Sequence, residues 1–106
     1  MPNYLGEFEF LVLLAVARLG ETAYGVTIQQ TLAERARRVP SFGAIHSTLR
    51  RLEAKGLLRS RRGEPEAIRG GKAKKLVTLT PRGKAALRES QAALQRMTQG
   101  LDLSRA

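Results

Sequence analysis

The sequence contains no cysteine and no tryptophan, and it has one histidine and five Phe and Tyr residues in 106. The missing cysteines exclude a disulfide framework, an iron–sulfur cluster and a thiolate zinc site. The single histidine, His46, leaves no histidine cluster to hold a metal, so we expect a surface or phosphate-contacting role for it rather than a catalytic one. We therefore predict no cofactor and no metal, and an enzyme is the least expected class of protein.

Long apolar runs are missing as well. The longest, residues 10–17, has eight residues, whereas a helix that spans a membrane needs about 20. The first residues carry acids rather than cations, which is not typical of a signal peptide. These features predict a cytoplasmic protein of one domain with no membrane partner.

Acidic residues are scarce relative to basic ones. The chain has nine Asp and Glu against 19 Lys and Arg, a formal net charge of +10. The excess lies in residues 35–88, which hold 16 basic and three acidic residues. Localised positive charge attracts polyanions, and nucleic acid is favoured here over an anionic membrane or an acidic protein.

Residues 41–56 are the stretch around which the chain is organised. Ser41 suits a helix N-cap and Gly56 the C′ position that ends a helix. The opposite faces of this helix differ in character. Ile45, Leu49 and Leu52 share one face at helical spacing and should point into a core. The other face is small at its start and cationic further along, carrying Gly43, Ala44, Ser47, Arg50 and Arg51. A helix of this kind fits a DNA groove, although an ordinary amphipathic surface helix remains the alternative.

Two helices are expected before it. Residues 5–19 are apolar nearly all round, so we expect part of this helix to be buried by a second protomer; a central helix in a compact monomer is the alternative. Residues 22–38 should form the second helix, with Tyr24, Ile28, Leu32 and Ala36 facing the core. A short turn through Pro40 then leads to the basic helix, which is the layout of a helix-turn-helix.

A basic hairpin should follow. Residues 57–62 and 75–79 suit two strands, joined by a turn-rich loop at 63–74. Seven cations and two acids fall between residues 59 and 75, which predicts a wing that lies along a phosphate backbone; a solvated hairpin with incidental cations is the alternative.

The last expected helix starts with Thr80 as N-cap and Pro81 at its first position and runs to about residue 99, with a frayed tail at 101–106. We predict that it pairs with the first helix, within the chain and across a two-fold axis. The predicted fold is mostly α with a small β-hairpin (α+β), a winged helix-turn-helix in the order α-α-α-β-β-α. Residues 1–80 would form the DNA-binding domain and residues 81–106 the C-terminal dimerisation helix and tail.

The order and spacing of several short motifs resemble the PadR-like family of bacterial winged-helix transcriptional regulators. These motifs are Tyr24-Gly25, residues 41–45, 49–53 and 55–57, the wing residues 63–65 and 69–72, and residues 79–83. The resemblance implies a homodimer, built from the first and last helices, that binds a palindromic operator at the bacterial nucleoid, usually as a repressor. His46 departs from the family, whose members usually have tyrosine there. Some members bind aromatic compounds at the dimer interface, an arrangement not expected without tryptophan; another small-molecule effector stays open.

The predicted site residues fall into two sets. Contacts to double-stranded DNA are expected from Ser41, Gly43, Ala44, His46, Ser47, Arg50, Arg51, Arg61, Arg62, Arg69, Lys72 and Lys74. The dimer interface is expected at Leu5, Phe8, Leu11, Val12, Leu87, Leu94 and Met97. An RNA-binding or ribosome-associated winged helix is the main alternative function, disfavoured by the shortage of aromatics for base stacking. A protein-interaction domain with incidental wing charge is the second alternative.

Overall fold

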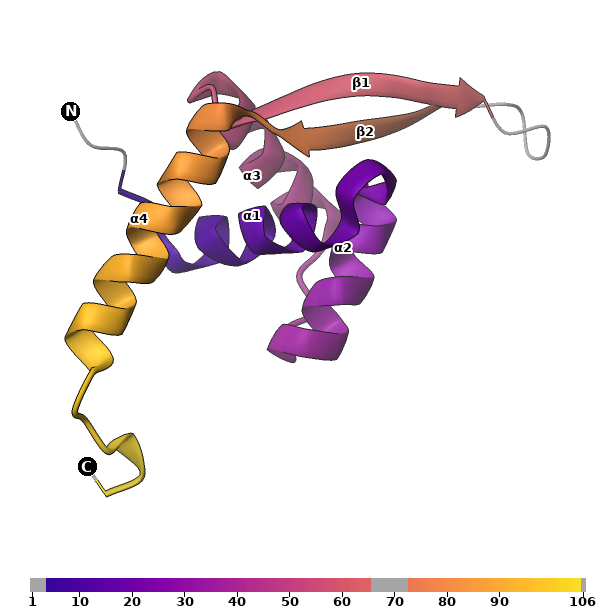
Figure 1. The fold of residues 1–106 in the computed structure, drawn as a ribbon. Coiled ribbons are helices and arrows are strands. Elements are labelled where there is room, and N and C mark those ends of the chain that lie inside the picture. Colours follow the sequence, from indigo (N-terminus) through magenta and orange to yellow (C-terminus); the bar gives the residue numbers. More distant parts are fainter. Residues whose placement is uncertain (1–3, 66–72, 106) are drawn as a thin grey trace.

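The computed structural model describes residues 4–65 and 73–105 of the chain. Within these ranges, three helices precede a two-stranded antiparallel hairpin and a fourth helix follows it, in the order α1, α2, α3, β1, β2, α4 (Figure 1). This confirms the predicted winged helix-turn-helix fold and the predicted order of its elements. No helix of the described residues is long and apolar enough to cross a membrane.

The first helix, α1, spans Glu7–Leu19 and forms the centre of the core. It ends at Gly20, whose φ of 58° is the left-handed backbone that a glycine adopts without strain. Leu13 and Val12 have no exposed surface, and Val16 has almost none. The prediction that placed Val12 at a dimer interface is therefore corrected, because this side chain is enclosed within its own protomer.

The second helix is shorter than the single helix predicted over residues 22–38. It spans Gly25–Thr31 as α2 and widens into a π-helical turn at Leu32–Ala36. It begins late because the Tyr24 amide donates to the Thr27 hydroxyl at 3.0 Å, which caps the helix at Tyr24. Tyr24 is half-buried rather than part of the core, and the neighbouring Ala23 takes the core position instead.

The third helix, α3, spans Phe42–Ala54 and agrees with its prediction at both ends. The Ser41 hydroxyl accepts a hydrogen bond from the Ala44 amide at 3.1 Å, as expected of an N-cap. Gly56 takes a φ of 78° directly after the helix. The predicted inward face is confirmed, since Ile45, Leu49 and Leu52 are all buried.

The hairpin is longer than predicted, with β1 at Leu58–Pro65 and β2 at Ala73–Leu79. The strands pair from Leu58 with Leu79 to Arg62 with Lys75, and the register shifts between Arg62 and Pro65. Most of the predicted loop falls in residues 66–72, outside the described residues. The Val77 amide donates to the Ala23 carbonyl at 2.9 Å, which ties β2 to the segment before α2.

The last helix, α4, spans Pro81–Thr98 and is anchored at its start. The Thr80 hydroxyl accepts from the Gly83 amide at 3.0 Å and donates to the Gly56 carbonyl at 2.6 Å. Gly83, Ala86 and Leu87 are buried in the core, whereas the second half of the helix extends away from the domain (Figure 1). A short 3-10 turn at Leu103–Arg105 follows, where fraying was predicted.

Candidate nucleic-acid interface

The outward side of α3 carries small and basic residues together with Phe42 and His46. We call its exposed residues, with the N-cap, the reading face: Ser41, Phe42, Gly43, Ala44, His46, Ser47, Arg50, Arg51 and Ala54. All the residues that the sequence predicted on this helix are among them. None of the nine is acidic, so nothing on the reading face would repel a phosphate backbone.

A carboxylate of α1 holds the end of α3. Glu9 is 8% exposed, and its two oxygens accept from the Lys55 ammonium at 3.2 and 3.0 Å. The Arg51 Nε lies 3.7 Å from the same carboxylate, and its Nη2 donates to the Thr48 hydroxyl at 3.2 Å. Arg51, predicted as a phosphate contact, therefore also lies beside Glu9, while 55% of its side chain stays exposed. We call Glu9, Arg51 and Lys55 the α1–α3 clamp.

The charge state of the clamp follows from its surroundings. Burial raises the pKa of the Glu9 carboxyl, but the Gly6 amide at 3.0 Å, the Lys55 ammonium and the Arg51 guanidinium more than offset it. The net result is a pKa below the ordinary value of 4.5. Glu9 thus stays ionised at neutral pH, and α3 is fixed to α1 by a charged contact.

A second carboxylate attaches the hairpin to α3. The Ser60 hydroxyl of β1 donates to Glu53 Oε1 at 2.8 Å, and the Lys75 ammonium of β2 lies 3.7 Å from Glu53 Oε2. Glu53 therefore contacts both strands of the hairpin from the helix that carries the reading face. This arrangement fixes the root of the hairpin relative to α3.

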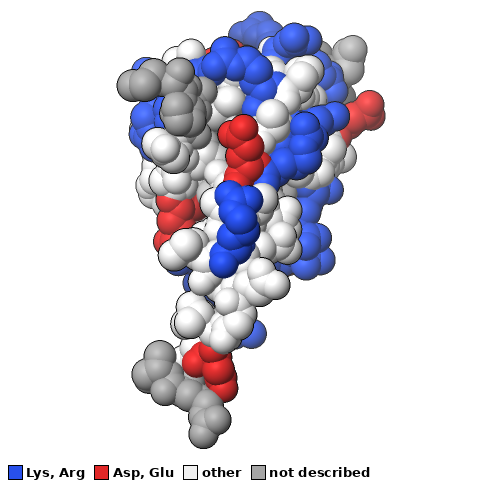
Figure 2. All heavy atoms as spheres, turned by 60° about the vertical axis from the view of Figure 1, so that its left-hand side comes forward, with Lys and Arg blue, Asp and Glu red and all other residues white. Residues whose placement is uncertain are grey.

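The hairpin presents cations along its length. Arg59, Arg61, Arg62 and Lys75 are exposed. Lys74 lies over the ring of Tyr24, with its ammonium 4.7 Å from the ring centroid, a cation–π contact. The predicted contacts Arg69 and Lys72 lie outside the described residues. Side chains of Lys and Arg gather over the upper half of the face shown in Figure 2, and the hairpin lies at the same height in Figure 1.

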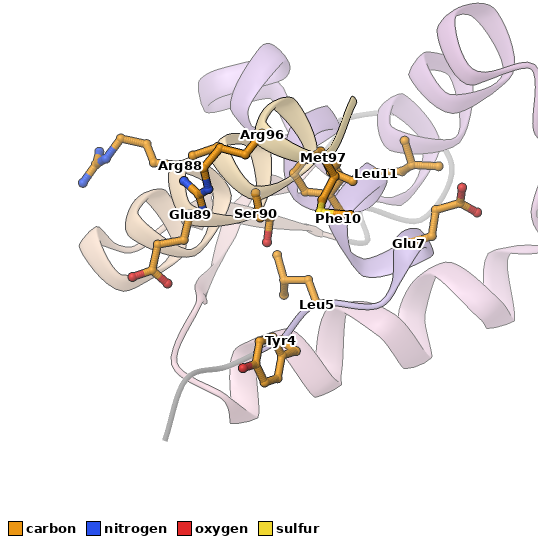
Figure 3. Close-up of a pocket in the computed structure, with 13 residues that line it drawn as sticks. Tyr4, Leu5, Glu7, Phe10, Leu11, Arg88, Glu89, Ser90, Arg96 and Met97 are labelled. Atoms are coloured by element: carbon orange, nitrogen blue, oxygen red, sulfur yellow. The ribbon is translucent and has the colours of Figure 1, made fainter. Parts of the chain in front are cut away.

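A groove of about 1080 Å³ runs between the start of α1 and the outer half of α4 (Figure 3). Four of the seven residues predicted at a dimer interface line it: Leu5, Leu11, Leu94 and Met97. Leu94 is 52% exposed and Met97 76% exposed. Tyr4 and Phe10 also line the groove, while Arg88 and Glu89 extend outward from it (Figure 3).

The other predicted interface residues lie elsewhere. Val12 and Leu87 are buried in the core, and Phe8 is half-buried against it. The residues of α1 that were predicted at the interface come from two different faces of the helix. A helix that is apolar nearly all round has no polar side to mark which face is inward. Phe10, on the face that lines the groove, was missed for this reason.

Sequence reasoning missed two further kinds of residue. Glu9 and Glu53 carry no local signal, because their partners are remote in the sequence or in another element. Phe42 was not placed on the outward face of α3, although its position directly after the N-cap could have marked it as exposed. Among the described residues, no group of three His, Cys, Asp or Glu could hold a metal ion.

The chain is similar in sequence to a known protein family and to a characterised regulator. The family described as "Transcriptional regulator PadR-like family" matches residues 13–89. The transcriptional regulator Rv3488 of Mycobacterium tuberculosis is 38% identical over 74 residues, which span 70% of this chain and 64% of that protein, slightly under two thirds of its length.

Solved structures share the fold. A PadR family transcription regulator from Clostridium difficile R20291 superposes with a TM-score of 0.75 at 22% identity, over 89% of this chain and 93% of that one. Bacillus subtilis PadR, solved in complex with operator DNA, superposes with a TM-score of 0.64 at 26% identity, over 79% of this chain and 46% of that one.

Proposed function

The chain belongs to the PadR-like family of transcriptional regulators, and from this premise we propose that it binds double-stranded DNA sequence-specifically as a homodimer and represses transcription at a palindromic operator. It is a winged-helix regulator and not an enzyme. The observation that carries the proposal is the acid-free reading face of α3, flanked by the cationic hairpin. Its place of action in this proposal is the bacterial nucleoid in the cytoplasm.

We assign the polar contacts by position on α3. Arg50 lies in the basic part of the reading face, and an arginine can bind guanine through two hydrogen bonds in the major groove. Ser47 and Ala44 lie one turn and nearly two turns before it, where small side chains let the helix approach the base edges. Ser41 and His46 are assigned to phosphates. Arg51 belongs to the clamp but stays 55% exposed, so we assign it both to holding α3 on α1 and to a phosphate contact.

The hairpin is assigned to the phosphate backbone. Arg61, Arg62 and Lys74 contribute charge beside the reading face, and Arg69 and Lys72 belong to the same hairpin by sequence. Glu53 supports this role because it fixes the hairpin root to α3. Contacts to phosphate position a protein on a duplex without reading its sequence.

A second copy is the proposed occupant of the α1–α4 groove. The outer half of α4 contributes large exposed apolar side chains that its own protomer does not cover. A symmetric dimer would bury the same groove on both copies. Two reading faces would then lie about one helical turn apart, roughly 34–36 Å, on the same side of a duplex.

The test starts from a random pool of double-stranded DNA at about 0.15 M salt, where specific and non-specific affinities separate. The enriched sequence should be palindromic. Fluorescence anisotropy then compares two variants on the enriched and on random duplexes. Arg50→Ala should weaken the enriched duplex selectively by about 10-fold or more. Arg61→Ala should weaken both duplexes alike and lower the salt slope by about one.

The outcomes separate the rival functions. Equal effects of the two variants on both duplexes would refute the assignment of Arg50 to the bases. Tighter binding of RNA hairpins than of any duplex DNA would favour the RNA-binding interpretation. An enriched site without two-fold symmetry would contradict the proposed dimer on DNA.

A further inference from the structure

A small cleft lies beside the reading face, between the start of α2, the start of α3 and strand β2. It is open to solvent, has a volume of about 400 Å³ and is lined by Tyr24, Gly25, Val26, Phe42, His46 and Lys75. None of these lining residues is acidic. The cleft is thus open to a polyanion on the same side as the residues assigned to DNA.

Two large apolar side chains are exposed in this cleft. Phe42, the first residue of α3, is 45% exposed, and Val26 in the first turn of α2 is 41% exposed. Neither belongs to the hydrophobic core. Single exposed apolar residues are common on protein surfaces. Here two share one recess at the N-terminal end of α3, which also carries Ala44, assigned to base edges, and His46, assigned to a phosphate.

Gly25 brings the two helices close together at this point. A Cβ added at Gly25 would lie 3.4 Å from Cε1 of His46, in contact with the imidazole. The ring of His46 therefore lies against the backbone of α2, one turn along α3 from Phe42. This contact gives the cleft a wall that α2 and α3 share.

Two cations lie beside the apolar residues. Lys75 lines the cleft directly, and Lys74 lies over the ring of Tyr24, which also lines it. A protein partner with an apolar anchor would have to tolerate this positive rim, whereas a DNA strand offers phosphates to the rim and base edges to the recess. Charge complementarity therefore favours DNA as the occupant.

We propose that this cleft receives the 5-methyl group of a thymine in each operator half-site, with Phe42 and Val26 as specificity-determining residues. The inference rests on the proposed function and adds an apolar element to its polar base contacts. The thymine methyl is the apolar group that a base pair presents in the major groove, and phenylalanine is among the side chains that contact it. Burial of one methyl group corresponds to about fourfold in affinity.

The experiment uses the full chain and the duplex enriched from the random pool. Each thymine of one half-site is replaced in turn by deoxyuridine, which removes only the methyl group, and affinity is measured by fluorescence anisotropy. At one position, uracil should weaken binding by about fourfold for the unmodified protein. Phe42→Ala should bind the thymine and uracil duplexes equally, and Val26→Ala should reduce the difference.

Two controls keep the result interpretable. Phe42→Leu retains apolar surface and should retain part of the preference for thymine. Val39→Ala removes an exposed apolar side chain that does not line the cleft and should retain all of it. Thermal melting by circular dichroism checks that each variant folds, which is expected because Phe42 lies outside the core.

The inference and the proposed function fail in different ways. If the unmodified protein binds its operator but no uracil replacement weakens binding, or if Phe42→Ala keeps the full preference for thymine, the methyl recess is refuted and the proposed function stands. If the unmodified protein binds no duplex DNA at all, both are overturned.

Discussion

Replacement of Gly83 by alanine should disrupt the joint between α4 and the rest of the domain. Gly83 lies in the first turn of α4, directly against the backbone of Leu57. An added Cβ would overlap the Leu57 carbonyl oxygen and lie 3.1 Å from its carbonyl carbon and 3.2 Å from Cδ2 of Leu79. The obstacle is mainly backbone, so no side-chain rotation can relieve it.

The cost of this substitution can be estimated from the contacts that must move. Overpacking a core costs about 1–3 kcal/mol and occasionally more. Withdrawal of α4 would also break the hydrogen bond from the Thr80 amide to the Leu57 carbonyl, 3.2 Å, and the bond from the Thr80 hydroxyl to the Gly56 carbonyl. Each lost bond adds about 1 kcal/mol. The total is about 4 kcal/mol, which lowers Tm by roughly 15–30 °C for a domain of this size.

Thermal melting followed by circular dichroism measures this effect at one fixed protein concentration, because the proposed dimerisation makes Tm depend on concentration. Gly43→Ala is the matched control, since a Cβ there meets only the Ser41 hydroxyl oxygen, 3.9 Å away. The control should melt at the Tm of the unmodified protein or up to about 4–8 °C above it, since helix propensity adds at most about 1 kcal/mol. If Gly83→Ala lowers Tm by less than about 3 °C, the close contact at this joint is refuted.

Three further predictions concern the clamp, the groove and the cap of α4. Because the folded-state pKa of Glu9 is below its ordinary value of 4.5, its stabilisation is present above about pH 4.5 and lost as pH falls through the folded pKa. Glu9→Gln should therefore lower the free energy of unfolding at pH 7 by about 1–3 kcal/mol. The free energy of unfolding of this variant should also fall less steeply as the pH is lowered. Urea titration at several pH values measures both effects, and an unchanged acid dependence would contradict the clamp. Leu94→Glu should sediment as a monomer and Val39→Glu, exposed outside the groove, as a dimer; two dimers would contradict the groove as the interface. Thr80→Ala should lower stability by about 2 kcal/mol, because it removes both the cap of α4 and the hydrogen bond to the Gly56 carbonyl. The Tm should fall by roughly 8–16 °C, and an unchanged Tm would show that water replaces the hydroxyl.

Local signals made α3 and the start of α4 predictable. A cap is formed by a residue and an amide three positions later, so Ser41 and Thr80 could be placed from their immediate neighbours. The inward face of α3 was equally clear, because polar and apolar residues alternate at helical spacing. The winged fold followed from the order of these elements and was confirmed.

Interactions between distant residues could not be predicted in the same way. The clamp joins Glu9 to Lys55, 46 positions away, and nothing near Glu9 in the sequence indicates a buried carboxylate. The division of α1 into a core face and a groove face depends on where α4 crosses it, which periodicity does not reveal. The cleft at Phe42 needs three elements together, and each contributes only one to three residues to it.

The position of Glu9 next to Phe10 has a consequence for operator architecture. Consecutive residues of one rigid helix serve two purposes: Phe10 lines the groove proposed for the second copy, and Glu9 grips α3. In the described residues, no flexible linker separates the proposed dimer contact from the contact that holds α3. The distance between the two α3 helices of the proposed dimer should therefore not adjust to a longer site. One inserted base pair would displace a half-site by about 3.4 Å along the axis and turn it by roughly 35°. We therefore expect the proposed dimer to tolerate little change in the spacing between half-sites, because α1 carries both contacts.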